Sequence, residues 1–139
     1  MSARIPALFR DDLLIFQGEG NLFAEYFVSL HPQNRFDMNR TDITQSISRA
    51  LHSLAMPIEA CLYGSEARGE ARADSDIDLL ILVDQPTVTD SDEDRIFAPL
   101  YQIELQTGVL INPIIMPKQE WGRRVSPFYL NVENEGVRL

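Results

Sequence analysis

The strand-like segment from Asp76 to Val83 constrains the fold more than any other part of the sequence. Its last five residues, 79–83, are all apolar, whereas Asp76 and Asp78 at its start carry charge. Side chains alternate between the two faces of a strand, so an unbroken apolar run must be covered on both faces. We therefore predict a central strand with two aspartates at one end.

Helices and strands alternate around this segment. The predicted helices cover residues 42–56, 66–68, 89–107, 117–123 and 126–136, and the other strands cover 58–63 and 109–116. Asp42 and Gln45 resemble a capping box, Pro57 should end the first helix, and Gly108 fits a helix C-terminus. Pro99 should kink or shorten its helix. The order predicts an α/β (α+β) domain with a small mixed β-sheet flanked by helices.

Residues 1–37 differ from the rest of the chain. They hold five of the seven phenylalanines and show no clean period, so we predict an N-terminal extension followed by one domain over 38–139. Met38 directly precedes the first helix, which suggests the hypothesis that it is the natural initiator. The apolar extension offers a surface for homo-oligomerisation.

Composition excludes several classes of function. Twelve basic and twenty-one acidic residues give a formal charge of -9, which argues against nonspecific nucleic-acid binding. A single cysteine, Cys61, allows no internal disulfide. We see no apolar run long enough for a membrane span and no signal peptide, so we expect a cytoplasmic protein with no membrane contact.

A candidate phosphate site follows the strand at 58–63. Gly64 lets a ligand approach the backbone closely, and Ser65 adds a hydroxyl donor at the start of a short helix. Arg68 lies one turn further on, where its guanidinium could reach the same phosphates, although an exposed ion pair with Glu66 or Glu70 is the alternative. Phosphate is the anion that such a turn favours.

A candidate metal site lies at Asp76 and Asp78. Two residues apart on a strand, they point to the same face, with backbones about 6–7 Å apart. Magnesium prefers oxygen ligands and often binds one or two carboxylates together with substrate phosphates. The two sites together predict an enzyme that binds a nucleoside triphosphate with Mg²⁺.

The segment 62–79, with Gly64-Ser65, Ala67-Arg68-Gly69 and Ser75-Asp76-Ile77-Asp78-Leu79, resembles the minimal nucleotidyltransferases of the DNA polymerase β-like superfamily. This resemblance implies metal-dependent transfer of a nucleoside monophosphate, expected to be AMP from ATP, to a hydroxyl acceptor. It also implies catalysis and magnesium binding by Asp76 and Asp78, and phosphate contacts by Gly64 and Ser65. Many members are antitoxins whose partner is a helical HEPN-type ribonuclease, so a HEPN-type partner is implied here too.

The chain departs from that family at the third carboxylate. The expected position is Asn112, whose neutral amide can bind a metal but cannot accept a proton. Glu104 on the preceding helix is a second candidate for the missing acid. Two hypotheses follow: a working, slow nucleotidyltransferase, or an antitoxin-like module that keeps the nucleotide pocket and acts by covering its partner.

Overall fold

The computed structural model describes residues 38–139. In chain order the elements are α3 (Arg40–His52), β1 (Ile58–Tyr63), α4 (Gly64–Ala67), β2 (Ile77–Val83), α5 (Asp90–Thr107), β3 (Ile111–Pro117), the 3-10 helix η1 (Lys118–Glu120), α6 (Pro127–Glu135) and β4 (Val137–Arg138). The prediction for residues 1–37 lies outside the described residues. Within 38–139 no helix has the length and apolar character that a membrane crossing requires.

Within residues 38–139 the four strands form one mixed sheet in the order β3-β2-β1-β4. β2 runs parallel to β3 and antiparallel to β1, and β1 is antiparallel to β4. The prediction that 77–83 is a central strand is confirmed, because β2 pairs on both sides. The predicted α+β fold with a mixed sheet is confirmed as well.

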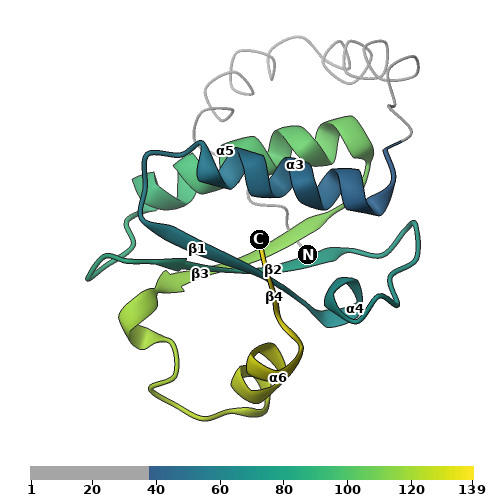
Figure 1. Cartoon of the computed structure of the whole chain (residues 1–139). Coiled ribbons are helices and arrows are strands. Elements are labelled where there is room, and N and C mark those ends of the chain that lie inside the picture. Colours follow the sequence, from purple (N-terminus) through teal and green to yellow (C-terminus); the bar gives the residue numbers. More distant parts are fainter. Residues whose placement is uncertain (1–37) are drawn as a thin grey trace, which may run out of the picture.

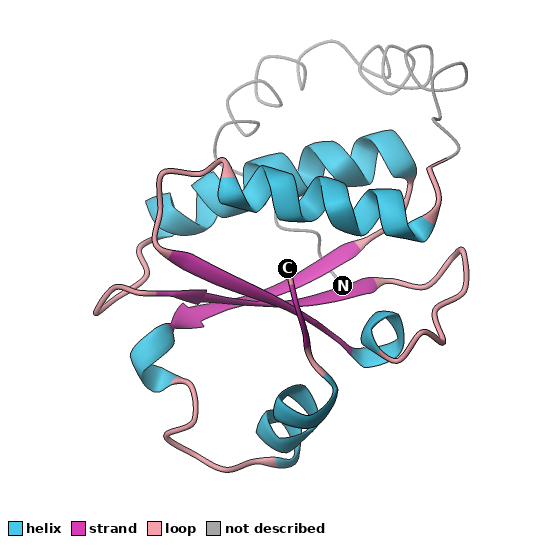
Figure 2. Cartoon of the chain, in the orientation of Figure 1, coloured by secondary structure: helices cyan, strands magenta, loops and turns pink. Residues whose placement is uncertain are grey.

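Helices cover both faces of the sheet. Figure 1 shows α3 and α5 side by side on one face and α6 on the other, and Figure 2 shows the same two layers around the strands. Ile77, Leu79 and Ile81 belong to the larger core beneath α3 and α5. Leu80 and Leu82 point the opposite way and form a second, smaller core with Val132 of α6. This double coverage explains the unbroken apolar run of β2.

The first helix differs from its prediction at both ends. Asn39 is the N-cap, and its side chain accepts the backbone N–H of Asp42 at 2.9 Å. The predicted capping box of Asp42 and Gln45 is therefore wrong, because Asp42 already lies inside the helix. α3 also ends at His52, several residues before Pro57.

The later helices keep closer to their predictions. α5 begins at a capping box of Thr89 and Asp92 and ends at Gly108, whose φ of 73° is left-handed. The helix continues through Pro99, so the predicted shortening does not occur. α6 is capped by Ser126, as predicted. The predicted helix at 117–123 is only the single 3-10 turn η1, and β3 begins two residues later than expected.

Candidate active site

Three strands bring the predicted site residues to one end of the sheet. β1 ends at Tyr63, directly before Gly64, and the antiparallel β2 begins there, with Asp78 opposite Tyr63. β3 is parallel to β2, so it starts at the same end, with Asn112 opposite Asp78. The sheet topology therefore gathers three segments that are far apart in the sequence.

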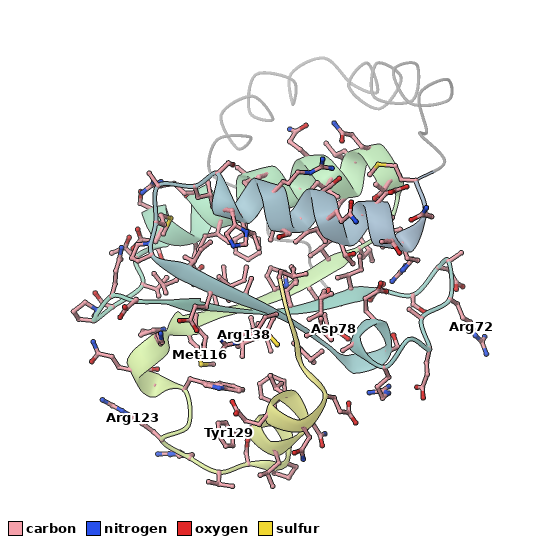
Figure 3. All side chains as sticks on the ribbon, viewed as in Figure 1. Arg72, Asp78, Met116, Arg123, Tyr129 and Arg138 are labelled. Atoms are coloured by element: carbon pink, nitrogen blue, oxygen red, sulfur yellow. The ribbon has the colours of Figure 1, made fainter. Side chains whose placement is uncertain are left out.

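Gly64 lies against Asp78. A Cβ built on Gly64 would be 2.7 Å from Oδ2 of Asp78, and the glycine has a φ of +71°. Both the left-handed backbone and the close approach require glycine at this position. Figure 3 shows Asp78 on the sheet beside α4. The Gly64 backbone and the Asp78 carboxylate thus approach each other with no side chain between them.

Asp76 lies at the same end of the sheet and is linked to Asn112 by a hydrogen bond. The Nδ2 of Asn112 donates a hydrogen bond to Oδ2 of Asp76 at 3.1 Å. Asn112 shares a sheet face with Asp78, because residues paired across two strands point to the same side. Both aspartates are partly exposed. Two carboxylates and one amide therefore line one accessible end of the sheet.

This donor set suits magnesium. Within residues 38–139 no three His, Cys, Asp or Glu side chains gather closely enough to hold a metal among themselves. Mg²⁺ needs only one or two carboxylates where substrate phosphates supply further oxygens, and an amide oxygen is an acceptable ligand. Rotation of the Asn112 amide by half a turn would bring its oxygen toward Asp76 in place of the nitrogen. The residues fit a magnesium ion shared with a triphosphate.

Ser65 lies on α4 and Arg68 is the residue that ends this helix, and the two have different surroundings. Ser65 stands in the first turn, and no side chain caps that helix. Arg68 is exposed and forms ion pairs with Glu70 at 2.9 Å and Glu135 at 3.1 Å. These hydrogen bonds raise the pKa of the Arg68 guanidinium. The structure thus joins Arg68 to the end of α6, not to the contact between Gly64 and Asp78.

Glu104 lies close to the site without joining the metal group. Its Oε1 accepts the backbone N–H of Ile111 at 2.7 Å, at the start of β3. Burial raises the pKa of the Glu104 carboxyl; the hydrogen bond from Ile111 acts in the opposite sense, and the charge of Asp76 raises the pKa further. Glu104 therefore anchors the strand that carries Asn112.

Arg40 is a further residue at this end of the sheet, and no sequence pattern indicates it. Arg40, in the first turn of α3, bonds to Glu66 of α4 and to the backbone just before Asp76. No local pattern marks it, because its partners are 26 and 35 residues away in the sequence. Only the fold brings α3 to this end of the sheet.

A glycine turn against Asp78, with Asp76 and Asn112 at the same end of a mixed sheet flanked by helices, is the arrangement expected of a nucleotidyltransferase. The sequence model of the nucleotidyltransferase domain matches residues 45–128. The chain belongs to this family, and its predicted resemblance to minimal nucleotidyltransferases is confirmed.

Two proteins of Methanocaldococcus jannaschii are similar to the chain. Each bears the name "putative protein adenylyltransferase". One is 36% identical over 76 residues, which cover 54% of this chain and 70% of the relative. The other is 37% identical over 79 residues, which cover 56% of this chain and 74% of the relative. The match thus spans most of each relative.

Proposed function

We propose that the protein transfers AMP from ATP to a hydroxyl group of another protein, with Mg²⁺ as cofactor. The observation that carries this proposal is the contact between Gly64 and Asp78, with the built Cβ only 2.7 Å from the carboxylate oxygen. It leaves no room for a side chain between a phosphate-binding turn and a metal-binding acid. A triphosphate and its metal would then occupy one continuous site.

Gly64 and Ser65 would hold the phosphates. The first N–H groups of a helix have no partner within it, and a side chain commonly caps them. Among the described α-helices, α3, α5 and α6 have such caps at Asn39, Thr89 and Ser126, whereas α4 has none. The open backbone donors and the Ser65 hydroxyl support phosphate binding at this turn. Arg68 could join them only by leaving Glu70 and Glu135.

Asp76 and Asp78 would hold Mg²⁺ with the amide oxygen of Asn112. The bound ion supplies positive charge that neutralises the triphosphate and the departing pyrophosphate. In the reaction a hydroxyl oxygen of the acceptor bonds to the α-phosphorus, and the bond from that phosphorus to the bridging oxygen breaks. Pyrophosphate leaves, and the hydroxyl proton passes to solvent.

The proposed class of acceptor, a protein, is inferred from the names of the two relatives. Both are named for adenylyl transfer to protein, which supports ATP as donor and a protein as acceptor. The family resemblance adds a HEPN-type helical toxin as the proposed partner. Hydroxyl-bearing side chains of such a partner are the acceptors to test.

A second function is favoured by Asn112. Its neutral amide stands at the position expected for the acid that the family usually supplies, and it bonds to Asp76 with its nitrogen, not with its metal-binding oxygen. A site of this kind can bind a nucleotide while transferring it slowly or not at all. The protein would then act as an antitoxin-like binding module.

Transfer from radiolabelled ATP separates the two functions. The protein, co-purified with its native partner, is incubated with Mg²⁺ and ATP labelled at the α- or the γ-phosphate. We expect label on the partner from the α-phosphate alone. Asp76→Ala and Asp78→Ala should lower the rate by at least about 100-fold, since the metal contributes several kcal/mol.

The control is Asp84→Ala, an exposed aspartate just beyond the opposite end of β2, which should transfer like the wild type. The binding module would be established instead by two results together. The partner receives no label from the α- or the γ-phosphate, and the Asp76→Ala and Asp78→Ala variants inhibit the partner as well as the wild type does.

A further inference from the structure

Arg40 makes an unusually large set of contacts for a side chain near the surface. Its Nε and Nη2 donate to the Oε2 of Glu66 at 2.9 and 2.8 Å. Its Nη1 donates to the carbonyl oxygen of Ser75 at 2.7 Å and, more weakly, to that of Ala73 at 3.4 Å. The side chains of Arg40 and Glu66 are only 19% and 11% exposed, so water screens this ion pair less than a surface pair.

The partners of Arg40 belong to the two halves of the site. Glu66 follows Ser65 in α4, the helix of the proposed phosphate turn. Ser75 directly precedes Asp76, the first proposed metal ligand. One guanidinium therefore ties the phosphate turn to the loop that carries the metal-binding acid.

The loop has further restraints at both ends: Gly69 and Glu70 donate backbone hydrogen bonds to α4, and Asn112 donates to Asp76. Residues 68–76 form no regular helix or strand, and a turn in which Arg72 and Ser75 exchange hydrogen bonds is its main internal feature. Figure 3 shows Arg72 at the outer end of this loop, pointing away from Asp78. The contacts of Arg40 with Ala73 and Ser75 hold the backbone before Asp76, while Asn112 holds the Asp76 side chain.

α3 gives Arg40 a rigid base. The helix is capped by Asn39 immediately before Arg40, and Ile43 and Ile47 are buried in the larger core one and two turns later. A guanidinium offers several N–H donors in one plane, so it can bond to a carboxylate and to a carbonyl at once. A lysine ammonium in the same place has no such planar fork.

We infer that Arg40 is a positioning residue that couples nucleotide binding to magnesium binding. This inference rests on the proposed function. By holding α4 and the Asp76 loop at a fixed separation, Arg40 keeps the phosphate donors and the metal ligands ready for one Mg²⁺-ATP complex. Without it, the turn still binds phosphate and Asp78 keeps its place in β2, but Asp76 no longer meets the metal in the right place.

The test compares Arg40→Gln with Arg49→Gln. Arg49 lies on the same helix, is exposed, and its side chain bonds only weakly to Ser46, at 3.4 Å, so it is the matched control. Calorimetry measures ATP binding with Mg²⁺ and with EDTA. We expect Arg40→Gln to weaken Mg²⁺-ATP binding about tenfold, or about 1.4 kcal/mol, and metal-free ATP binding less than about twofold. Arg40→Lys should recover only part of the loss.

A merely structural ion pair would predict a different result. It would lower the melting temperature of Arg40→Gln but leave the affinity of the folded protein for Mg²⁺-ATP equal to that of Arg49→Gln. Equal affinities, or an equal loss with and without Mg²⁺, would overturn the inference.

Amide hydrogen exchange tests the positioning role without a nucleotide. Residues 69–76 should exchange faster in Arg40→Gln than in Arg49→Gln, and unchanged exchange would count against the inference. If the wild type fails to bind Mg²⁺-ATP, the proposed function fails, while faster exchange would still support positioning by Arg40. Glu66→Gln, which keeps the acceptor oxygen but loses the charge, replaces Arg40→Gln if that variant does not fold.

Discussion

Asn112 is neutral, and so it limits the negative charge that the site can offer to a metal ion. It lies beside Asp78 in the sheet and donates to Asp76, so it relieves the repulsion between two neighbouring carboxylates. An acid there would add a metal ligand, but it would also add a third negative charge. On the proposed function, the amide would thus stabilise the metal-free site at the expense of metal affinity.

Asn112→Asp should therefore be less stable without metal and more responsive to it. In EDTA we expect the free energy of unfolding to fall by about 1–4 kcal/mol, the size of a close like-charge repulsion at partial exposure. Mg²⁺ should raise the melting temperature of this variant more than that of the wild type, and AMP transfer should quicken. Thermal melts with and without Mg²⁺ measure this.

The control for that substitution is Asn131→Asp, an exposed residue on α6. It should respond to Mg²⁺ as the wild type does. An Asn112→Asp variant with the wild-type magnesium response would show that residue 112 does not contact the metal.

Alanine at Gly64 tests the proposed phosphate site, and alanine at Gly69 is the matched control. Both glycines have left-handed φ values, +71° and +70°, but a Cβ at Gly69 would meet nothing within 4 Å. Alanine should cost about 1–2 kcal/mol of stability at either site through backbone strain. Gly64→Ala alone should displace Asp78 and weaken Mg²⁺-ATP binding by at least about tenfold, as measured by calorimetry. Equal binding by the two variants would contradict a phosphate site at Gly64.

Local sequence patterns predicted most of the helices and strands. The bounds of β1 were predicted correctly, and α5 begins and ends at the residues that Thr89 and Gly108 indicate. These predictions succeeded because alternation, caps and apolar spacing are properties of neighbouring residues. The first helix failed because Asn39 and Asp42 are both good caps, and the choice between them depends on where α3 packs.

Contacts between elements were less predictable. The motif placed Gly64, Asp76 and Asp78 near one another, but the strand order that puts Asn112 beside Asp78 came only with the structure. The roles of Arg40 and Glu104 depend on helices that cross the ends of strands, and no spacing in the sequence encodes such crossings. Long-range side-chain contacts are thus the part of the site that sequence alone did not supply.

Glu104 links two such elements, α5 and β3, and it predicts a dependence of stability on pH. Burial and Asp76 raise its pKa above the ordinary value of 4.5. The folded state therefore holds this proton to a higher pH than the unfolded state does. The resulting contribution to stability is largest at low pH, falls as the pH rises from about 4.5 through the folded pKa, and then levels off.

Glu104→Gln should remove that contribution while keeping the hydrogen bond to the Ile111 N–H. Urea unfolding between about pH 4 and 7 should show a smaller decline of stability with pH in this variant than in the wild type. Glu120→Gln, an exposed change in η1, should follow the wild type. A Glu104→Gln curve parallel to the wild-type curve would contradict a raised pKa.

In the molecule as a whole, α6 packs on the sheet face opposite α3 and α5, and β4 extends the edge of the sheet beside β1. β4 pairs with β1 at Leu62 and Cys61, Val132 packs on Leu80 and Leu82, and Glu135 holds Arg68. The family match ends at residue 128, so most of α6 lies beyond it. These contacts predict that α6 belongs to the same folding unit as the site.

Val132→Ala tests whether α6 and the sheet unfold together. Val132 is 5% exposed, and its truncation should cost about 1–3 kcal/mol through lost burial and a residual cavity. Trp121, the single tryptophan, packs against Phe128 of α6, so its fluorescence reports on this face, whereas circular dichroism reports on all helices. If the molecule folds as one unit, both probes should shift together in urea.

The control, Leu130→Ala, is 47% exposed on the same helix and should change stability by less than about 0.5 kcal/mol. An early fluorescence transition in Val132→Ala, with circular dichroism unchanged, would mean that α6 detaches by itself. Such detachment would release Arg68 from Glu135 and leave the ion pair with Glu70 as its remaining restraint. Coincident transitions would instead mean that α6 and the sheet that carries the site fold and unfold together.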